Sequence, residues 1–167
     1  SDLNEKSYLL DCIDSNFVSS AGAKVDEFER QVASFTGAKN AIAVVNGTNA
    51  LQIALILAGV GEEDEVLTQA LTFVATCNAI SYVGAAPVFI DVDKDTFTIN
   101  LDTIKKNVTN KTKAIIHVSL NNRYKNMPEL VNYCKDQKFY LIEDSAQSLG
   151  SFYKDKQYLD IVFSLYW

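Results

Sequence analysis

The sequence has little proline, glycine or basic charge, and each shortage excludes a class of protein. Only 2 prolines and 7 glycines occur among 167 residues, and hydrophobic residues make up 48%. Collagenous, low-complexity and disordered classes therefore do not apply, and the chain is long enough for one sizeable core. Lysine and arginine number 15 against 21 acidic residues, for a net charge of −6. Because no basic cluster occurs, we expect neither nucleic acid nor an anionic membrane as a partner.

Cysteine and histidine are also scarce. The three cysteines are odd in number and far apart, which matches neither a disulfide framework nor a CxxC metal site: Cys12, Cys77 and Cys134. We interpret them as reduced thiols of a cytoplasmic protein. The single histidine, His117, rules out a histidine-rich zinc site. No apolar run approaches the roughly 18 residues of a membrane span, and no basic-then-apolar export signal is expected at the start.

Short β-branched runs alternate with longer amphipathic runs, a pattern that predicts a parallel sheet with crossover helices. The predicted strands cover residues 41–45, 65–68, 87–91, 114–118, 139–143 and 161–165. The predicted helices cover residues 25–35 before Gly37, 47–58, 72–82 and a segment that begins near Asn126 and Pro128. The helix over 47–58 is apolar almost all round, so we expect it to be buried. No repeat or linker marks a boundary, and we expect one domain over residues 1–167.

Residues 44–51, VVNGTNAL, place a tight polar turn between a strand and a helix. The unpaired N–H groups of a helix N-terminus, with a glycine that lets an anion approach, suit a phosphate. An ordinary capped turn is the simpler explanation of the same residues when they are taken alone. Asp91, Asp93 and Asp95 resemble the start of a calcium loop, but Thr96 stands where that loop needs glycine, so we interpret them as a solvated loop. No metal site is predicted.

Residues 141–147, LIEDSAQ, deliver acids and an amide to the end of a predicted strand. Ligands of open α/β sheets gather at that edge. Asp144 could hold a proton on a bound heterocycle, or it could cap the following turn. Phe73, at the start of a helix, could stack on a flat cofactor or pack in the core.

These segments occur together and in this order, with residues 84–93 and 112–116 between them. The combination resembles the DegT/DnrJ/EryC1/StrS family of sugar aminotransferases from about Phe17 to Trp167. The resemblance implies a fold-type I large domain, a three-layer α/β/α sandwich with pyridoxal 5′-phosphate as cofactor. It also implies that the smaller C-terminal domain lies outside this chain.

The resemblance assigns a role to six residues. Gly47 and Thr48 match the phosphate-binding turn, and Ser164 matches a serine that adds a phosphate contact. Phe73 matches the aromatic residue that stacks on the pyridine ring. Asp144 matches the acid that pairs with the ring nitrogen, and Gln147 matches a residue near the 3′ oxygen of the cofactor.

The family's Schiff-base lysine follows that serine by five residues, two positions beyond Trp167, so we expect no catalytic lysine within this chain. Two departures from the family concern loops. Gln69 and Ala70 stand where a proline is common, and residues 119–123, SLNNR, replace an aromatic and glycine-rich turn. His117 is interpreted as a structural residue rather than a catalytic base.

The resemblance implies transamination of a nucleotide-linked keto sugar by a homodimer, with glutamate or glutamine as amino donor. Two alternatives remain open. One is a sugar dehydratase of the same family, in which histidine replaces the lysine. The other is a truncated domain that folds without catalysing a reaction.

Overall fold

The computed structural model describes residues 4–120 and 127–151, together with the backbone of residues 162–165. The chain divides into two compact units, residues 1–43 and 44–167. The first unit contains α1 (Glu5–Asp14) and α2 (Ala23–Thr36). Gly37 ends α2 in the left-handed conformation, with a φ of 75°, as the sequence predicts.

The second unit is built on a sheet of five parallel strands. These are β1 (Glu65–Gln69), β2 (Ala86–Ile90), β3 (Thr112–Val118), β4 (Tyr140–Asp144) and β5 (Val162–Leu165). Their spatial order is β2-β1-β3-β4-β5, and every neighbouring pair is parallel. Five of the six predicted strands are confirmed within two residues at each end. All five strands end at the same edge of the sheet.

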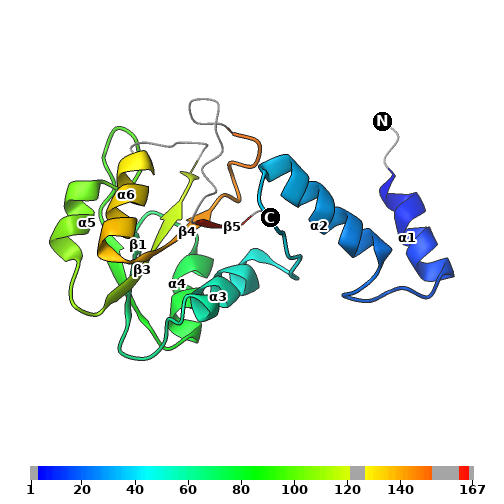
Figure 1. Ribbon diagram of the computed structural model, residues 1–167, viewed down its shortest axis with the longest axis horizontal. Helices are drawn as coiled ribbons and strands as arrows, with labels where there is room; N and C mark the ends of the chain where they lie inside the picture. Colours follow the sequence, from blue (N-terminus) through cyan, green and yellow to red (C-terminus); the bar gives the residue numbers. More distant parts are fainter. Residues whose placement is uncertain (1–3, 121–126, 152–161, 166–167) are drawn as a thin grey trace. The chain divides into compact units, whose positions relative to one another are not determined.

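Helices cover both faces of this sheet (Figure 1). α3 (Gly47–Leu57) and α4 (Val74–Tyr82) pack on one face, and α5 (Leu101–Asn107) and α6 (Met127–Gln137) pack on the other. The side chains of β3 show the alternation that this requires, since Ile116 lies in the cluster under α3 and α4, and Ile115 lies in the cluster under α5 and α6. The expected three-layer α/β/α sandwich is confirmed.

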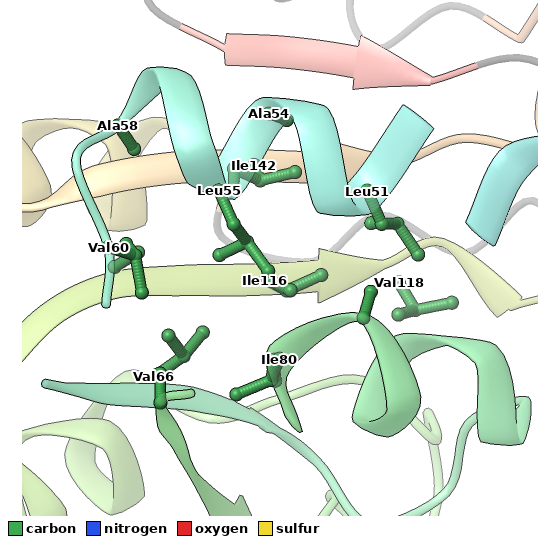
Figure 2. Close-up of a cluster of buried hydrophobic side chains, with 13 residues drawn as sticks. Leu51, Ala54, Leu55, Ala58, Val60, Val66, Ile80, Ile116, Val118 and Ile142 are labelled. Carbon is green, nitrogen blue, oxygen red and sulfur yellow. The ribbon is translucent and has the colours of Figure 1, made fainter. Parts of the chain in front are cut away.

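The direction of α3 places its N-terminus at the carboxyl ends of the strands. Figure 2 shows Leu51, in the first half of the helix, beside Val118 at the end of β3. After the helix, the carbonyl of Gly59 accepts a hydrogen bond from the side chain of Lys113, near the start of β3. The helix therefore runs antiparallel to the strands.

The expectation that α3 is buried all round is wrong. Leu51, Ala54 and Leu55 lie in the core, whereas Ile56 and Leu57 keep 56% and 65% of their surface exposed. One helix face suffices to cover the sheet, and the opposite apolar face has no neighbour among the described residues of this unit. No helix in the described ranges is long and apolar enough to cross a membrane.

The predicted strand at residues 41–45 is also wrong. No residue of this segment pairs with a strand in the described part of the chain. The N–H of Ala43 instead donates a hydrogen bond to the Glu29 carboxylate at 2.7 Å, and Val45 remains 82% exposed. β-branched residues favour an extended chain, but a strand also needs a neighbouring backbone to bond.

Candidate functional site

A cavity of about 460 Å³ lies where three central strands end. Its walls are the segments that continue those strands: residues 71–73 after β1, residues 118–120 at the end of β3, and Asp144, Ala146 and Gln147 at the end of β4. This volume is within the range of small-molecule sites, and the carboxyl edge of a parallel sheet is where such sites form. The structure therefore brings Phe73, Asp144 and Gln147 together around one cavity.

Asp144 places a nearly buried carboxylate against this cavity, with 5% of the residue exposed. Its main chain is in register with Val118, and its carbonyl accepts a hydrogen bond from the N–H of Ser119 at 3.0 Å. One carboxylate oxygen, Oδ1, accepts a hydrogen bond from the N–H of Ala146 at 3.1 Å. This side chain thus caps its own turn and also lines the cavity.

Phe73 lies at the rim of the cavity and not in the core. It is 69% exposed although it is a large aromatic side chain, and it directly precedes the first turn of α4. Core packing, the commoner use of phenylalanine, is therefore excluded for this residue. An exposed ring beside a cavity is suited to stacking on a flat ligand.

Gly47 and Thr48 form the first turn of α3 and do not line the cavity. The Asn46 side chain accepts a hydrogen bond from the N–H of Asn49 at 2.9 Å and caps the helix. In the described part of the chain, no hydrogen bond engages the N–H groups of Gly47 and Thr48. Because α3 is antiparallel to the strands, these groups lie at the same edge of the sheet as the cavity.

The carboxylate of Glu143 connects the residues that follow β3 and β4. Its Oε1 atom accepts hydrogen bonds from the hydroxyl groups of Ser145, at 2.8 Å, and Ser119, at 3.2 Å. All three residues are buried. Ser119 lines the cavity, although no role was predicted for it from the sequence. Its position as the polar residue directly after a buried strand is the signal that could have identified it.

His117 does not line the cavity. It lies two residues after Ile115, on the face of β3 that α5 and α6 cover. Complete burial lowers the pKa of His117 to about 4, because the charged form loses its hydration. The imidazole is therefore neutral at pH 7, in agreement with a structural residue.

Two further predictions concern the aspartate loop after β2 and Ser164. In the loop after β2, Asp93 Oδ1 accepts hydrogen bonds from the N–H groups of Asp95 and Thr96 and from the Thr96 hydroxyl, so this carboxylate stabilises its own turn. The described residues contain no cluster of potential metal ligands. Ser164 lies in β5, in register with Glu143, and its side chain lies outside the described residues, as does the predicted cap at Asn126.

The cavity and the adjoining edge of the sheet have the features that a flat, anionic heterocycle requires. Asp144 supplies a nearly buried carboxylate for a protonated ring nitrogen, and Phe73 supplies an exposed ring at the rim. The first turn of α3 supplies N–H groups and a positive dipole end for a phosphate. Pyridoxal 5′-phosphate combines these three chemical groups, so the residues present fit it.

Three curated relatives are similar in sequence to this chain over most of its length. The chain is 41% identical to GDP-perosamine synthase of Escherichia coli O157:H7 over 91% of the chain and 42% of that protein. It is 40% identical to UDP-2-acetamido-2-deoxy-3-oxo-D-glucuronate aminotransferase of Pseudomonas aeruginosa, over 81% of the chain and 38% of that protein. It is 38% identical to the spore coat polysaccharide biosynthesis protein SpsC of Bacillus subtilis, over 82% and 35%. The chain thus spans about two fifths of the length of these relatives.

Solved structures show the same fold. 3-Amino-5-hydroxybenzoic acid synthase superposes with a TM-score of 0.89 at 31% identity, over 96% of this chain and 42% of its own. A sugar aminotransferase of Streptococcus pneumoniae, described as putative and solved in its pyridoxal phosphate form, superposes with a TM-score of 0.81 at 30% identity, over 91% and 43%. Pyridoxal phosphate, the cofactor expected from the resemblance, is therefore found in a structural relative.

The match to a protein family extends over nearly the whole chain. Residues 1–161 match the DegT/DnrJ/EryC1/StrS aminotransferase family. The match includes the turn before α3, the segment with Phe73 and the end of β4 with Asp144, which are the places where the cavity and its surroundings carry their polar and aromatic groups. This chain belongs to the DegT/DnrJ/EryC1/StrS aminotransferase family.

Proposed function

We propose that this chain is the cofactor-binding part of a pyridoxal phosphate-dependent aminotransferase that acts on a nucleotide-linked keto sugar. The observation that carries the proposal is the cavity at the carboxyl edge of the sheet, which Asp144 and Phe73 both line. The family membership and the names of the relatives support the reaction class.

Pyridoxal phosphate, when bound, supplies an electron sink and carries the amino group between donor and acceptor. The first turn of α3, with Gly47 and Thr48, binds its phosphate through main-chain N–H groups. The ring of Phe73 covers one face of the heterocycle and excludes water from it. Asp144 holds a proton at the ring nitrogen, and the low polarity around its nearly buried carboxylate strengthens that ion pair.

Two further residues complete the proposed contacts. Gln147, on the same wall as Asp144, orients the 3′ oxygen of the cofactor through its amide. Ser164, on the edge strand β5 and in register with Glu143, adds a hydrogen bond to the phosphate. We assign no lysine of this chain to the covalent attachment of the cofactor that the family's lysine provides.

The substrate that we propose is a UDP- or GDP-linked keto hexose, with glutamate or glutamine as amino donor, and the product enters cell-surface polysaccharide. The names of the relatives in Escherichia coli, Pseudomonas aeruginosa and Bacillus subtilis support this class. The test is an assay of the protein with a panel of such sugars, followed by mass spectrometry. Amination supports the proposal, whereas loss of water from the sugar identifies a dehydratase and contradicts it.

The cofactor site can be tested on this chain alone with pyridoxamine 5′-phosphate, which binds without a covalent bond to the protein. We expect saturable binding by calorimetry, and a loss of about tenfold in affinity for Asp144→Asn, since a charge-assisted hydrogen bond is replaced by a neutral one. Asp136→Asn, the same change at an exposed position of α6, serves as the matched control. Equal affinities of the two variants would contradict the assignment of Asp144.

We further propose that the protein is a cytoplasmic homodimer. The apolar face of α3 supports an interface, because Ile53, Ile56 and Leu57 are exposed there. The three free thiols support a reducing compartment. Sedimentation should show a dimer that Ile56→Lys weakens, and a stable monomer of the unchanged chain at high concentration would count against the interface.

A further inference from the structure

The walls of the cavity are joined at their base by the side chain of Gln69. This residue is the last of β1, and Ala70 separates it from the segment that forms one wall, residues 71–73. It is fully buried. The main-chain pairing of β1 with β3 extends to Thr68 and Ile116, so the two strands separate at Gln69, near the start of the cavity wall.

The amide of Gln69 bridges this separation with two hydrogen bonds to one residue. Its Nε2 donates to the carbonyl oxygen of Val118 at 3.0 Å, and its Oε1 accepts from the N–H of Val118 at 3.0 Å. A carboxamide is the side chain that offers a donor and an acceptor side by side, as a peptide group does. Gln69 thus acts as an additional peptide unit of the sheet, placed between β1 and β3.

Val118 connects this bridge to the candidate cofactor contact. It lines the cavity and is in register with Asp144 on β4. The next residue, Ser119, donates its N–H to the carbonyl of Asp144 at 3.0 Å. A shift of Val118 would therefore move both the cavity wall and the main chain that carries the Asp144 carboxylate.

We infer that Gln69 is a positioning residue of the cofactor cavity, which holds the end of β3 through Val118 and thereby sets the position of Asp144. The inference rests on the proposed function, since it assigns a role in that same site. Gln69 touches no ligand in this scheme and acts only through its neighbours.

The test compares the affinity for pyridoxamine 5′-phosphate with stability. Gln69→Met keeps the length of the side chain but removes both hydrogen bonds. We expect faster hydrogen exchange at the Val118 N–H and a loss of about tenfold in affinity, because two neutral hydrogen bonds are lost at the base of the site. If this variant does not fold, Gln69→Asn, which keeps the amide but is one methylene too short, replaces it, and we expect losses in the same direction.

Two controls separate positioning from general destabilisation. Thr68→Val changes the neighbouring residue, which is also fully buried, and should leave affinity within about twofold. Leu130→Ala creates a cavity under α6, in the cluster on the opposite face of the sheet, and should lower the free energy of unfolding without changing affinity in protein that is still folded.

The outcomes distinguish this inference from the proposed function. If the unchanged chain does not bind pyridoxamine 5′-phosphate, the proposed cofactor site is wrong. If it binds, and Asp144→Asn weakens binding while Gln69→Met does not, the site stands and the positioning role of Gln69 is refuted. The role is also refuted if Leu130→Ala lowers affinity as much as Gln69→Met at equal loss of stability.

Discussion

The Asn46 side chain caps α3 by accepting a hydrogen bond from the N–H of Asn49, 2.9 Å away. This bond uses the third N–H of the helix and leaves those of Gly47 and Thr48 to an incoming anion. Asn46→Ala should lower the free energy of unfolding by about 1 kcal/mol, the usual cost of losing an N-cap. Asn46→Asp keeps the cap, so its stability in urea should equal that of the unchanged chain.

The aspartate variant separates capping from anion binding. Its added negative charge would face the phosphate, and repulsion of about 1 kcal/mol should weaken pyridoxamine 5′-phosphate binding about fivefold. Asn100 offers a matched control, since its Oδ1 caps α5 through the N–H of Asp102. Asn100→Asp should leave affinity unchanged. If both aspartate variants bind alike, the phosphate does not bind at α3.

Phe73 should contribute to binding but not to folding. Because its ring is mostly exposed, Phe73→Ala should change the free energy of unfolding by less than about 0.5 kcal/mol. The loss of a stacked ring should weaken pyridoxamine 5′-phosphate binding by about two- to tenfold. Phe89→Ala, at an exposed position of β2, is the control for ring removal. Calorimetry and urea unfolding measure the two effects, and a large loss of stability in Phe73→Ala would place the ring in the core.

His117 should make the fold sensitive to acid. Burial lowers its pKa from 6.5 to about 4, so between these pH values the unfolded chain binds a proton that the folded chain does not. Stability from this group is complete above pH 6.5 and is lost as the pH falls toward 4, with a slope approaching about 1.4 kcal/mol per pH unit. His117→Gln should flatten the dependence of urea unfolding on pH in this range.

The interpretation of that pH dependence is direct, because His117 is the single histidine of the chain. Carboxylates also titrate toward pH 4, and they remain in both proteins, so the difference between the two pH profiles isolates the imidazole. Identical profiles between pH 4 and 6.5 would mean that the imidazole can be protonated within the folded protein.

The sheet could be predicted from the sequence because its strands are buried on both faces and therefore appear as continuous apolar runs. The neighbours Leu141 and Ile142 show this, with Leu141 in one core cluster and Ile142 in the other. The same reasoning failed for residues 41–45, where the run of β-branched residues has no neighbouring strand in the described part of the chain. It also failed for the outer face of α3, since composition does not reveal how much of an apolar helix the sheet covers.

The candidate site could be predicted in part, because polar and aromatic residues at strand ends are visible in a sequence. That rule identified Asp144 and Phe73. It could not reveal the bridge from Gln69 to Val118, since these residues are 49 positions apart and the partner is a main-chain group that every residue carries. Contacts between a side chain and a distant backbone leave no pattern in the sequence.

Thr68 offers a test of packing next to this bridge. This threonine is fully buried in β1, and within the described ranges its hydroxyl group has no hydrogen-bond partner. A buried polar group without a partner loses its hydration and gains nothing in return, which costs about 1–3 kcal/mol. Thr68→Val keeps the shape and removes that cost, so the variant should unfold at a higher urea concentration, with about 1 kcal/mol of added stability.

Thr98→Val is the contrasting control, since the Thr98 hydroxyl is hydrogen-bonded to that of Thr96 at 2.9 Å and its loss should destabilise the chain. If Thr68→Val destabilises the chain as well, the hydroxyl of Thr68 has a partner, such as a bound water, and the end of β1 is more polar than its apolar surroundings indicate.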